Sequence, residues 1–189
     1  LITSKEIKGL ELNAGRFTAM SRQTGMGHDS IRGKHTPGLT AANIAGATYA
    51  FSDNLTGTFA ASDVDDHFKK QYINLNLTVP VDESQALNFD LNAYRSKDQG
   101  EALSGPLDNK IWSLAAAYSL GAHKFTVAYQ RSSGDTGYNY GVDGGGTVFL
   151  ANSIQISDFL GKEEKSWQAR YDLNMASYGV PGSVSYTHL

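Results

Sequence analysis

The chain has 189 residues, and its 16 lysines and arginines against 19 aspartates and glutamates give a formal net charge of −3. This balance lacks the basic excess with which proteins bind polyanions, so it argues against nucleic acid as a partner. The absence of cysteine excludes disulfides, thiolate zinc sites and cysteine nucleophiles. The longest apolar stretches, such as residues 112–120, reach about half the length of a membrane-spanning helix, so a membrane location would require strands.

The start of the chain lacks the features of a secretory leader. It begins at Leu1 without a methionine, a basic segment or an apolar segment. We therefore expect an internal piece of a longer protein. The first predicted strand covers residues 10–14, in which apolar and polar side chains alternate.

Alternation of apolar and polar residues continues along the chain and predicts antiparallel strands. Short polar turns join three pairs of them into hairpins, at residues 45–51 with 55–61, 71–79 with 87–94, and 112–120 with 125–130. Residues 167–175 form a further predicted strand. In the central hairpin, one face is apolar and the other carries mainly asparagine, aspartate and threonine. The fold class is therefore all-β.

The connections between these strands are of two kinds. Those near Ser52, Asp82 and Gly121 are short, whereas three others are long, polar and contain glycine, at residues 18–40, 96–110 and 133–165. Aromatic residues lie near the strand ends, where a bilayer interface favours them. An outer-membrane β-barrel typically has strands of about ten residues with one apolar face. Its connections are typically short at one end of the strands and long at the other.

A soluble antiparallel β-sheet ligand-binding module is the alternative, because periodicity alone does not say whether the apolar face meets lipid or a core. The polar face contains almost no lysine or glutamate, whereas water-exposed faces of soluble sheets are usually rich in both. This composition favours the transmembrane barrel.

One block near the end of the chain carries a family resemblance. Residues 165–182 read KSWQARYDLNMASYGVPG, and they resemble the signature of the OprD family of substrate-selective outer membrane porins. Residues 112–118, 149–153 and 157–159 support the resemblance in the expected order. It implies an internal fragment of an eighteen-stranded antiparallel transmembrane β-barrel. Residues 1–182 are then a partial barrel, and residues 183–189, which depart from the family pattern, are a divergent truncated end.

The resemblance also implies a function and a location. Family members lie in the outer membrane of Gram-negative cells and pass small carboxylate-bearing nutrients, such as amino acids or aromatic acids, by passive diffusion. We therefore expect a channel and not an enzyme, with such solutes and outer-membrane lipid as its partners. The resemblance leaves open whether the complete protein is a monomer or a trimer.

Two loop residues match constriction positions of the family. The resemblance implies that residues 133–165 form a loop that narrows the pore. It also implies that Ser153 and Asp158 lie at the constriction, where Asp158 would attract a cationic group of the solute. Ile156 occupies a position where basic amino-acid channels of the family carry tyrosine, which leaves amino-acid selectivity open. The structural alternative is that Ser153 and Asp158 only stabilise a loop turn.

Two basic residues are candidates for the pore wall. Arg170 lies on the polar face of its strand and could bind a carboxylate with two hydrogen bonds. Its alternative role is an internal ion pair with Asp172 or Asp90. Lys70 is in phase with the polar face of its strand, but it lies near the strand end, where it could be a surface charge.

Chemical motifs of enzymes are weak in this sequence. Residues 63–67 combine three aspartates with a histidine, but they lack the glycine and the distal glutamate of a calcium loop, so a solvated turn is the better explanation. We expect no metal and no cofactor.

Overall fold

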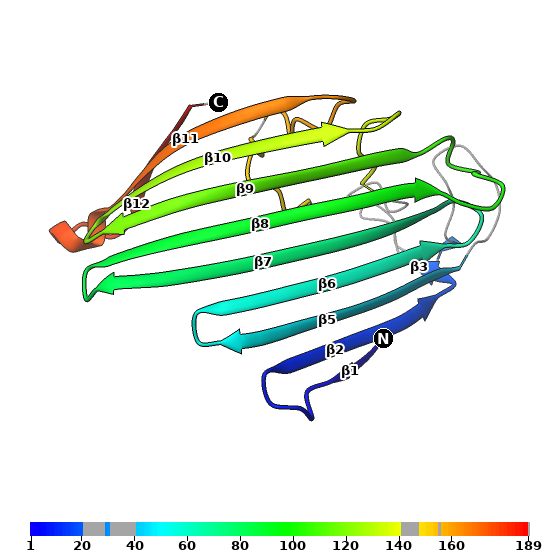
Figure 1. Ribbon diagram of the computed structural model, residues 1–189, viewed down its shortest axis with the longest axis horizontal. Helices are drawn as coiled ribbons and strands as arrows, with labels where there is room; N and C mark the ends of the chain where they lie inside the picture. Colours follow the sequence, from blue (N-terminus) through cyan, green and yellow to red (C-terminus); the bar gives the residue numbers. More distant parts are fainter. Residues whose placement is uncertain (21–28, 31–40, 141–147, 155, 189) are drawn as a thin grey trace.

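The computed structural model describes residues 1–20, 29–30, 41–140, 148–154 and 156–188. Ten strands of this part form one antiparallel sheet (Figure 1). In their order across the sheet they are β1 (Ile2–Ser4), β2 (Leu10–Phe17), β5 (Ala42–Ser52), β6 (Leu55–Val64), β7 (Phe68–Asp82), β8 (Gln85–Asp98), β9 (Asp108–Leu120), β10 (His123–Ser133), β11 (Lys165–Asn174) and β12 (Ser183–His188). Strands β3 (Ala19–Met20) and β4 (Asp29–Ser30) form a separate pair, and the 3-10 helix η1 (Met175–Tyr178) precedes β12.

The predicted all-β antiparallel class and the three hairpins are confirmed. β5 pairs with β6, β7 with β8, and β9 with β10, in each case through a short turn. Several strands are longer than predicted, because their polar ends continue the pairing beyond the apolar run: β7 has 15 residues where nine were expected. At the end of the chain, β12 pairs with β11.

The outer face of the sheet is apolar and exposed. Leu91 of β8 pairs with Leu75 of β7 and with Leu114 of β9, so the three side chains form a row across neighbouring strands. The exposed fractions of Leu75 and Leu114 are 41% and 43%. Isolated exposed leucines are common on soluble proteins, but a contiguous apolar face marks an interaction surface.

Aromatic side chains border this apolar face at both ends. Near one end, the Tyr129 ring lies 5.4 Å from Trp112 and 4.5 Å from Trp167 between ring centroids. Near the other end, Phe125 and Tyr171 lie 5.1 Å apart. We call the first group the upper aromatic belt, defined by Trp112, Tyr129 and Trp167.

The opposite, inner face is polar over most of its area and has two small apolar clusters. One consists of Val64, Phe68 and Leu107. In the other, Leu150 from the connection between β10 and β11 packs on Tyr94 and Ile111. The connection thus lies against the inner face of the sheet, and Figure 1 shows its described parts beside the strands rather than beyond their ends.

The two ends of the strands carry different connections. The turns from β5 to β6, β7 to β8 and β9 to β10 leave at one end. The connections from β8 to β9 and from β10 to β11 leave at the other end, which we call the long-connection end. Among the described residues, no helix has both the length and the hydrophobicity needed to cross a membrane.

Candidate functional site

A cavity of about 510 Å³ lies on the inner face below the connection from β10 to β11. Its wall comes from strands β7 to β11, and residues 149–151 of the connection close one side. Most of its side chains are amides or charged groups: Asn74, Asn76, Asn88, Asp90, Asn92, Lys124, Gln168, Arg170 and Asp172. Its volume is typical of sites for small molecules.

A hydrogen-bonded network of amides surrounds the Asp90 carboxylate on one side of this cavity. The side-chain amides of Asn74 and Asn76 each donate to Asp90 Oδ1 at 2.9 Å. The Asn92 amide donates to Asp90 Oδ2 at 2.6 Å. Because these residues alternate along β7 and β8, every partner points to the same face. The carboxylate is thereby held in one orientation with its charge toward the cavity.

Cationic groups line the opposite side of the cavity. Arg170 donates from Nε and Nη2 to Asp172 Oδ1, at 2.9 and 2.7 Å. The internal pair with Asp172 that the sequence offered as an alternative is therefore present, and the pair with Asp90 is not. Within the described residues, Nη1 of Arg170 donates no hydrogen bond. Lys124 lies opposite Asp172 in the β10–β11 register and also lines the cavity.

Gln130 fixes the connection to the wall. This side chain is 1% exposed, and its amide donates to the carbonyl oxygens of Asp158 and Phe159 at 2.8 and 3.1 Å. Its carbonyl oxygen accepts from the backbone N–H of Asn152 at 3.2 Å. One glutamine on β10 therefore satisfies three backbone groups of the connection.

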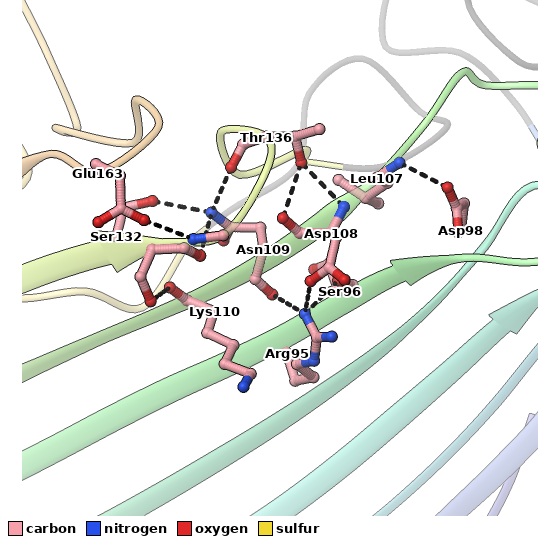
Figure 2. Close-up of polar contacts among 12 residues, drawn as sticks. Arg95, Ser96, Asp98, Leu107, Asp108, Asn109, Lys110, Ser132, Thr136 and Glu163 are labelled. Carbon is pink, nitrogen blue, oxygen red and sulfur yellow. Dashed lines mark hydrogen bonds and ion pairs between the residues drawn. The ribbon is translucent and has the colours of Figure 1, made fainter.

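Further contacts attach the connection to neighbouring strands. The N–H of Phe149 donates to the Tyr94 hydroxyl at 2.9 Å, and the N–H of Ala151 donates to the Ser113 hydroxyl at 3.0 Å. At its start, Asn109 donates to Ser132 Oγ and to the Thr136 carbonyl, both at 2.9 Å (Figure 2). The described parts of residues 134–164 are thus held against β8, β9 and β10.

Ser153 and Asp158 lie together at the tip of this connection. An isolated bridge between Ile154 and Ser157 brings them into contact, and the Ser153 hydroxyl donates to the Asp158 carboxylate. The Tyr140 hydroxyl donates to the other carboxylate oxygen. Burial, and then the bond to Asp158, raises the pKa of Tyr140 to about 12, so this tyrosine stays a donor at neutral pH. Ile156, at the turn itself, is 88% exposed.

Lys70 is bound to the connection and is not a free surface charge. Its ammonium donates to the carbonyl oxygen of Tyr140 at 2.9 Å and to the Tyr138 hydroxyl at 3.3 Å. It also lies 4.4 Å from the centroid of the Tyr138 ring, within range of a cation–π contact. Burial raises the pKa of Tyr138 well above its usual value. Lys70 therefore joins β7 to the connection.

The four residues that the sequence singled out do not form one cluster. Ser153 and Asp158 meet in the connection, Lys70 holds a neighbouring part of the same connection, and Arg170 lines the cavity below. The sequence analysis did not identify Lys124 or Gln130. Lys124 lies two residues before Thr126 on β10 and Gln130 four residues after it, so the alternation of the strand could have placed both on the inner face.

Residues 65–67, between β6 and β7, form a turn that contacts the connection from β8 to β9. His67 is buried, and its Nδ1 lies 2.6 Å from Ser104 Oγ, while the Leu103 N–H donates to the Asp66 carbonyl oxygen at 2.8 Å. Desolvation lowers the pKa of His67 despite the opposing effect of Asp66. The part of the chain that the structure describes contains no group of three or more metal-binding side chains.

We expect acid to loosen this contact. A histidine released from the turn binds a proton below about pH 6.5, whereas the buried ring resists protonation. The packed form is therefore fully stable above pH 6.5 and loses stability as the pH falls toward the lower pKa of His67. Amide exchange at Leu103, corrected for its intrinsic rate, should be faster at pH 5.5 than at pH 7.5. A His67→Gln variant should lose this pH dependence, and equal protection of the natural protein at both pH values would contradict the expectation.

The apolar outer face, its aromatic borders, the polar inner face and the connection that lies across it define the chain as part of the wall of a β-barrel channel. Comparison with known proteins identifies the family. The model of the outer membrane porin, OprD family, matches residues 1–188. The chain therefore belongs to the OprD family of Gram-negative outer membrane porins, which are channels rather than enzymes. Because the chain belongs to a porin family, the alternative of a soluble ligand-binding module does not apply.

Two known porins or porin-like proteins are similar to this chain in sequence. It is 45% identical over 190 residues to Porin D of Pseudomonas aeruginosa, covering 96% of this chain and 43% of that protein. It is 29% identical over 185 residues to the porin-like protein GalP of Pseudomonas putida, covering 96% of this chain and 44% of that protein.

Solved structures show the same architecture. The outer membrane protein OprD from Pseudomonas aeruginosa matches with a TM-score of 0.81 at 44% identity, covering 98% of this chain and 46% of that one. Pseudomonas aeruginosa OpdQ matches with a TM-score of 0.84 at 36% identity, covering 98% and 53%. The chain thus spans about half the length of its relatives, and its ten-stranded sheet is a fragment of a larger barrel.

Proposed function

We propose that the complete protein is a passive, substrate-selective channel for small carboxylate-bearing solutes, such as amino acids or aromatic acids. This chain supplies part of its wall and the connection that narrows it. The observation that carries the proposal is the polar cavity below the connection, with the guanidinium of Arg170 and the ammonium of Lys124 on one side and Asp90 on the other. No covalent step is involved, and each contact must be weak enough to release the solute.

The charges of the cavity fit a carboxylate. Asp172 is shared between Arg170 and Lys124, because it accepts from the first and lies opposite the second in the strand register. Two cations against one carboxylate leave a positive excess on this wall. The Nη1 group of Arg170 is a donor available to a passing carboxylate, and hydrogen bonds between charged groups are stronger than neutral ones.

Asp158 and Ser153 give the connection a complementary role. The Asp158 carboxylate already accepts two hydroxyl hydrogens, which fix its direction and leave its negative charge in place. In the proposal it attracts an ammonium group of the solute, while Arg170 binds the carboxylate further along. The proposal also assigns the exposed outer face, with Leu75 and Leu114, to contact with outer-membrane lipid.

Single-channel recording in a planar bilayer tests the proposal on the complete protein. We expect small ohmic steps that carboxylate solutes block. Arg170→Gln should raise the concentration needed for half-block by about tenfold or more for every carboxylate solute, since a charged hydrogen bond contributes about 1.5–3 kcal/mol. Asp158→Asn should weaken the block only for solutes that also carry an amine.

Amides of the same solutes serve as neutral controls, and Arg170→Gln should leave their weaker block unchanged. Absence of conductance from the correctly folded complete protein would refute the channel. Equal block by acids and their amides would refute selectivity for carboxylates while leaving the channel intact.

A further inference from the structure

We propose that the outer face of β7 to β11 carries a binding surface for an anionic lipid with a phosphate-bearing headgroup, at the long-connection end of the strands. The inference rests on the lipid-facing assignment of the outer face in the proposed channel. It concerns six basic side chains that follow the apolar part of each strand. We call them the basic row: Lys69, Arg95, Lys97, Lys110, Arg131 and Lys165.

Strand phase places the basic row on the outer face. Along β9, Lys110 precedes Trp112 by two residues, as Arg131 follows Tyr129 on β10 and Lys165 precedes Trp167 on β11. Residues two apart in a strand share a face and lie about 7 Å apart. The upper aromatic belt therefore has a cation just beyond each of its three rings. Figure 2 shows the Lys110 side chain directed away from the Asn109 amide, which serves the inner face.

The basic row contains three like-charge pairs in direct cross-strand register. Lys69 lies opposite Lys97, Arg95 opposite Lys110, and Arg131 opposite Lys165. Like charges in such positions destabilise a sheet, so their repetition on neighbouring strands calls for a compensating anion. Within a barrel wall, the gain from an external anionic partner would offset this repulsion.

The carboxylates of the chain compensate only half of these charges. Lys69 pairs with Asp63 at 3.2 Å, Arg95 with Asp108, and Arg131 approaches Glu163 at 3.9 Å. Asp108 also interacts electrostatically with Lys97 and Lys110, so one carboxylate serves three cations. Among the described residues, the ammonium groups of Lys97, Lys110 and Lys165 have no carboxylate within salt-bridge distance. Six cations thus face three carboxylates.

A groove runs from this row into the apolar face. It has a volume of about 320 Å³, and its apolar walls include Ile73, Ala93 and Trp112. Arg95 and Lys110 line the same groove, two residues further toward the long-connection end. Arg95 is held in place by bonds to Asp108 and to the carbonyl oxygen of Asn109 at 3.1 Å (Figure 2). An apolar groove with fixed cations at its edge suits an acyl chain joined to a phosphate.

A lipid satisfies both parts of this surface at once. Free phosphate would meet the cations but leave the groove and the belt empty, whereas a zwitterionic lipid would fill the groove without a net charge for the row. Basic residues close to a membrane attract anionic headgroups, and aromatic rings anchor at the same depth. The continuous sequence of apolar face, aromatic belt and basic row therefore favours an anionic lipid.

Native mass spectrometry of the complete protein in detergent tests the inference. The probes are phosphatidylglycerol, phosphatidylcholine with the same acyl chains, and lipopolysaccharide. We expect the natural protein to retain the first and the third but not the second. A Lys97→Gln, Lys110→Gln, Lys165→Gln triple variant should bind each anionic lipid at least tenfold more weakly, since one cation near such lipids contributes about fivefold. The matching triple lysine-to-arginine variant should bind as the natural protein does.

Lys124→Gln is the matched control, because it removes one lysine from the inner face and should leave lipid retention unchanged. Equal retention by the natural protein and the glutamine triple variant would overturn the inference, as would equal retention of phosphatidylcholine. Displacement of phosphatidylglycerol by millimolar inorganic phosphate would also overturn it, since the surface would then be a site for free anions. Conductance measured on the same samples separates this result from the channel proposal, because the basic row lies outside the pore.

Discussion

Leu114→Arg is expected to destabilise the folded complete barrel by about 2–4 kcal/mol, whereas Ala115→Arg, one residue further along β9, should cost far less. Leu114 belongs to the exposed row with Leu75 and Leu91. Along β9 it lies between Trp112 of one aromatic border and Tyr118, which pairs with Phe125 of the other, and a bilayer there has no water to solvate a guanidinium. Ala115 points to the inner face, where it lines the polar cavity and lies opposite Asp90 in the register.

Denaturant unfolding of the two variants in lipid vesicles provides the measurement. The pair is matched, because both substitutions add the same side chain to the same strand and differ only in the face. A smaller cost at Leu114 than at Ala115 would mean that the apolar face is covered by protein rather than by lipid. The same experiment in detergent micelles shows whether bilayer thickness contributes to the difference.

Gln130→Leu should detach the connection from the wall and increase single-channel conductance severalfold. The substitution preserves much of the side-chain volume but leaves two carbonyl oxygens and one N–H of the connection without their partner. Each unsatisfied buried group costs about 1–3 kcal/mol, so together they compete with the remaining contacts of the connection. We expect larger steps with more open-channel noise, and loss of block by carboxylate solutes.

Gln168→Leu is the control for this result. Gln168 lies on the inner face of β11, but within the described part of the connection it makes one hydrogen bond, of 3.3 Å, to the Ala151 carbonyl oxygen. It should therefore change conductance much less. Identical conductance of Gln130→Leu and the natural protein would show that Gln130 does not hold the connection in the open channel.

The sheet could be predicted because its information is local. Strict alternation in residues 71–79 and 87–94 fixed the faces of β7 and β8, and short polar turns fixed their pairing. Strand ends were underestimated, since polar residues such as Lys97 and Ser132 continue the pairing without continuing the apolar pattern. The eighteen-strand total and the divergent end at residues 183–189 stay predictions.

The candidate site was less predictable because its contacts cross long stretches of sequence. Lys70 was expected to be a wall cation or a surface charge, yet it binds residues 138–140, almost 70 positions away. Nothing local to Gln130 indicates that it will hold three backbone groups of another segment. Arg170 was easier, since its partner Asp172 lies two residues along the same strand face.

The way in which the connection from β10 to β11 is attached has a consequence for the evolution of the gene. The connection and the described side chains that hold it, including Lys70, Tyr94, Ser113 and Gln130, all lie between residues 68 and 172. The exchange of one continuous gene segment between related genes could therefore replace the connection together with the side chains that hold it. In the proposed channel, the selectivity of the pore would then pass between related barrels as one contiguous segment.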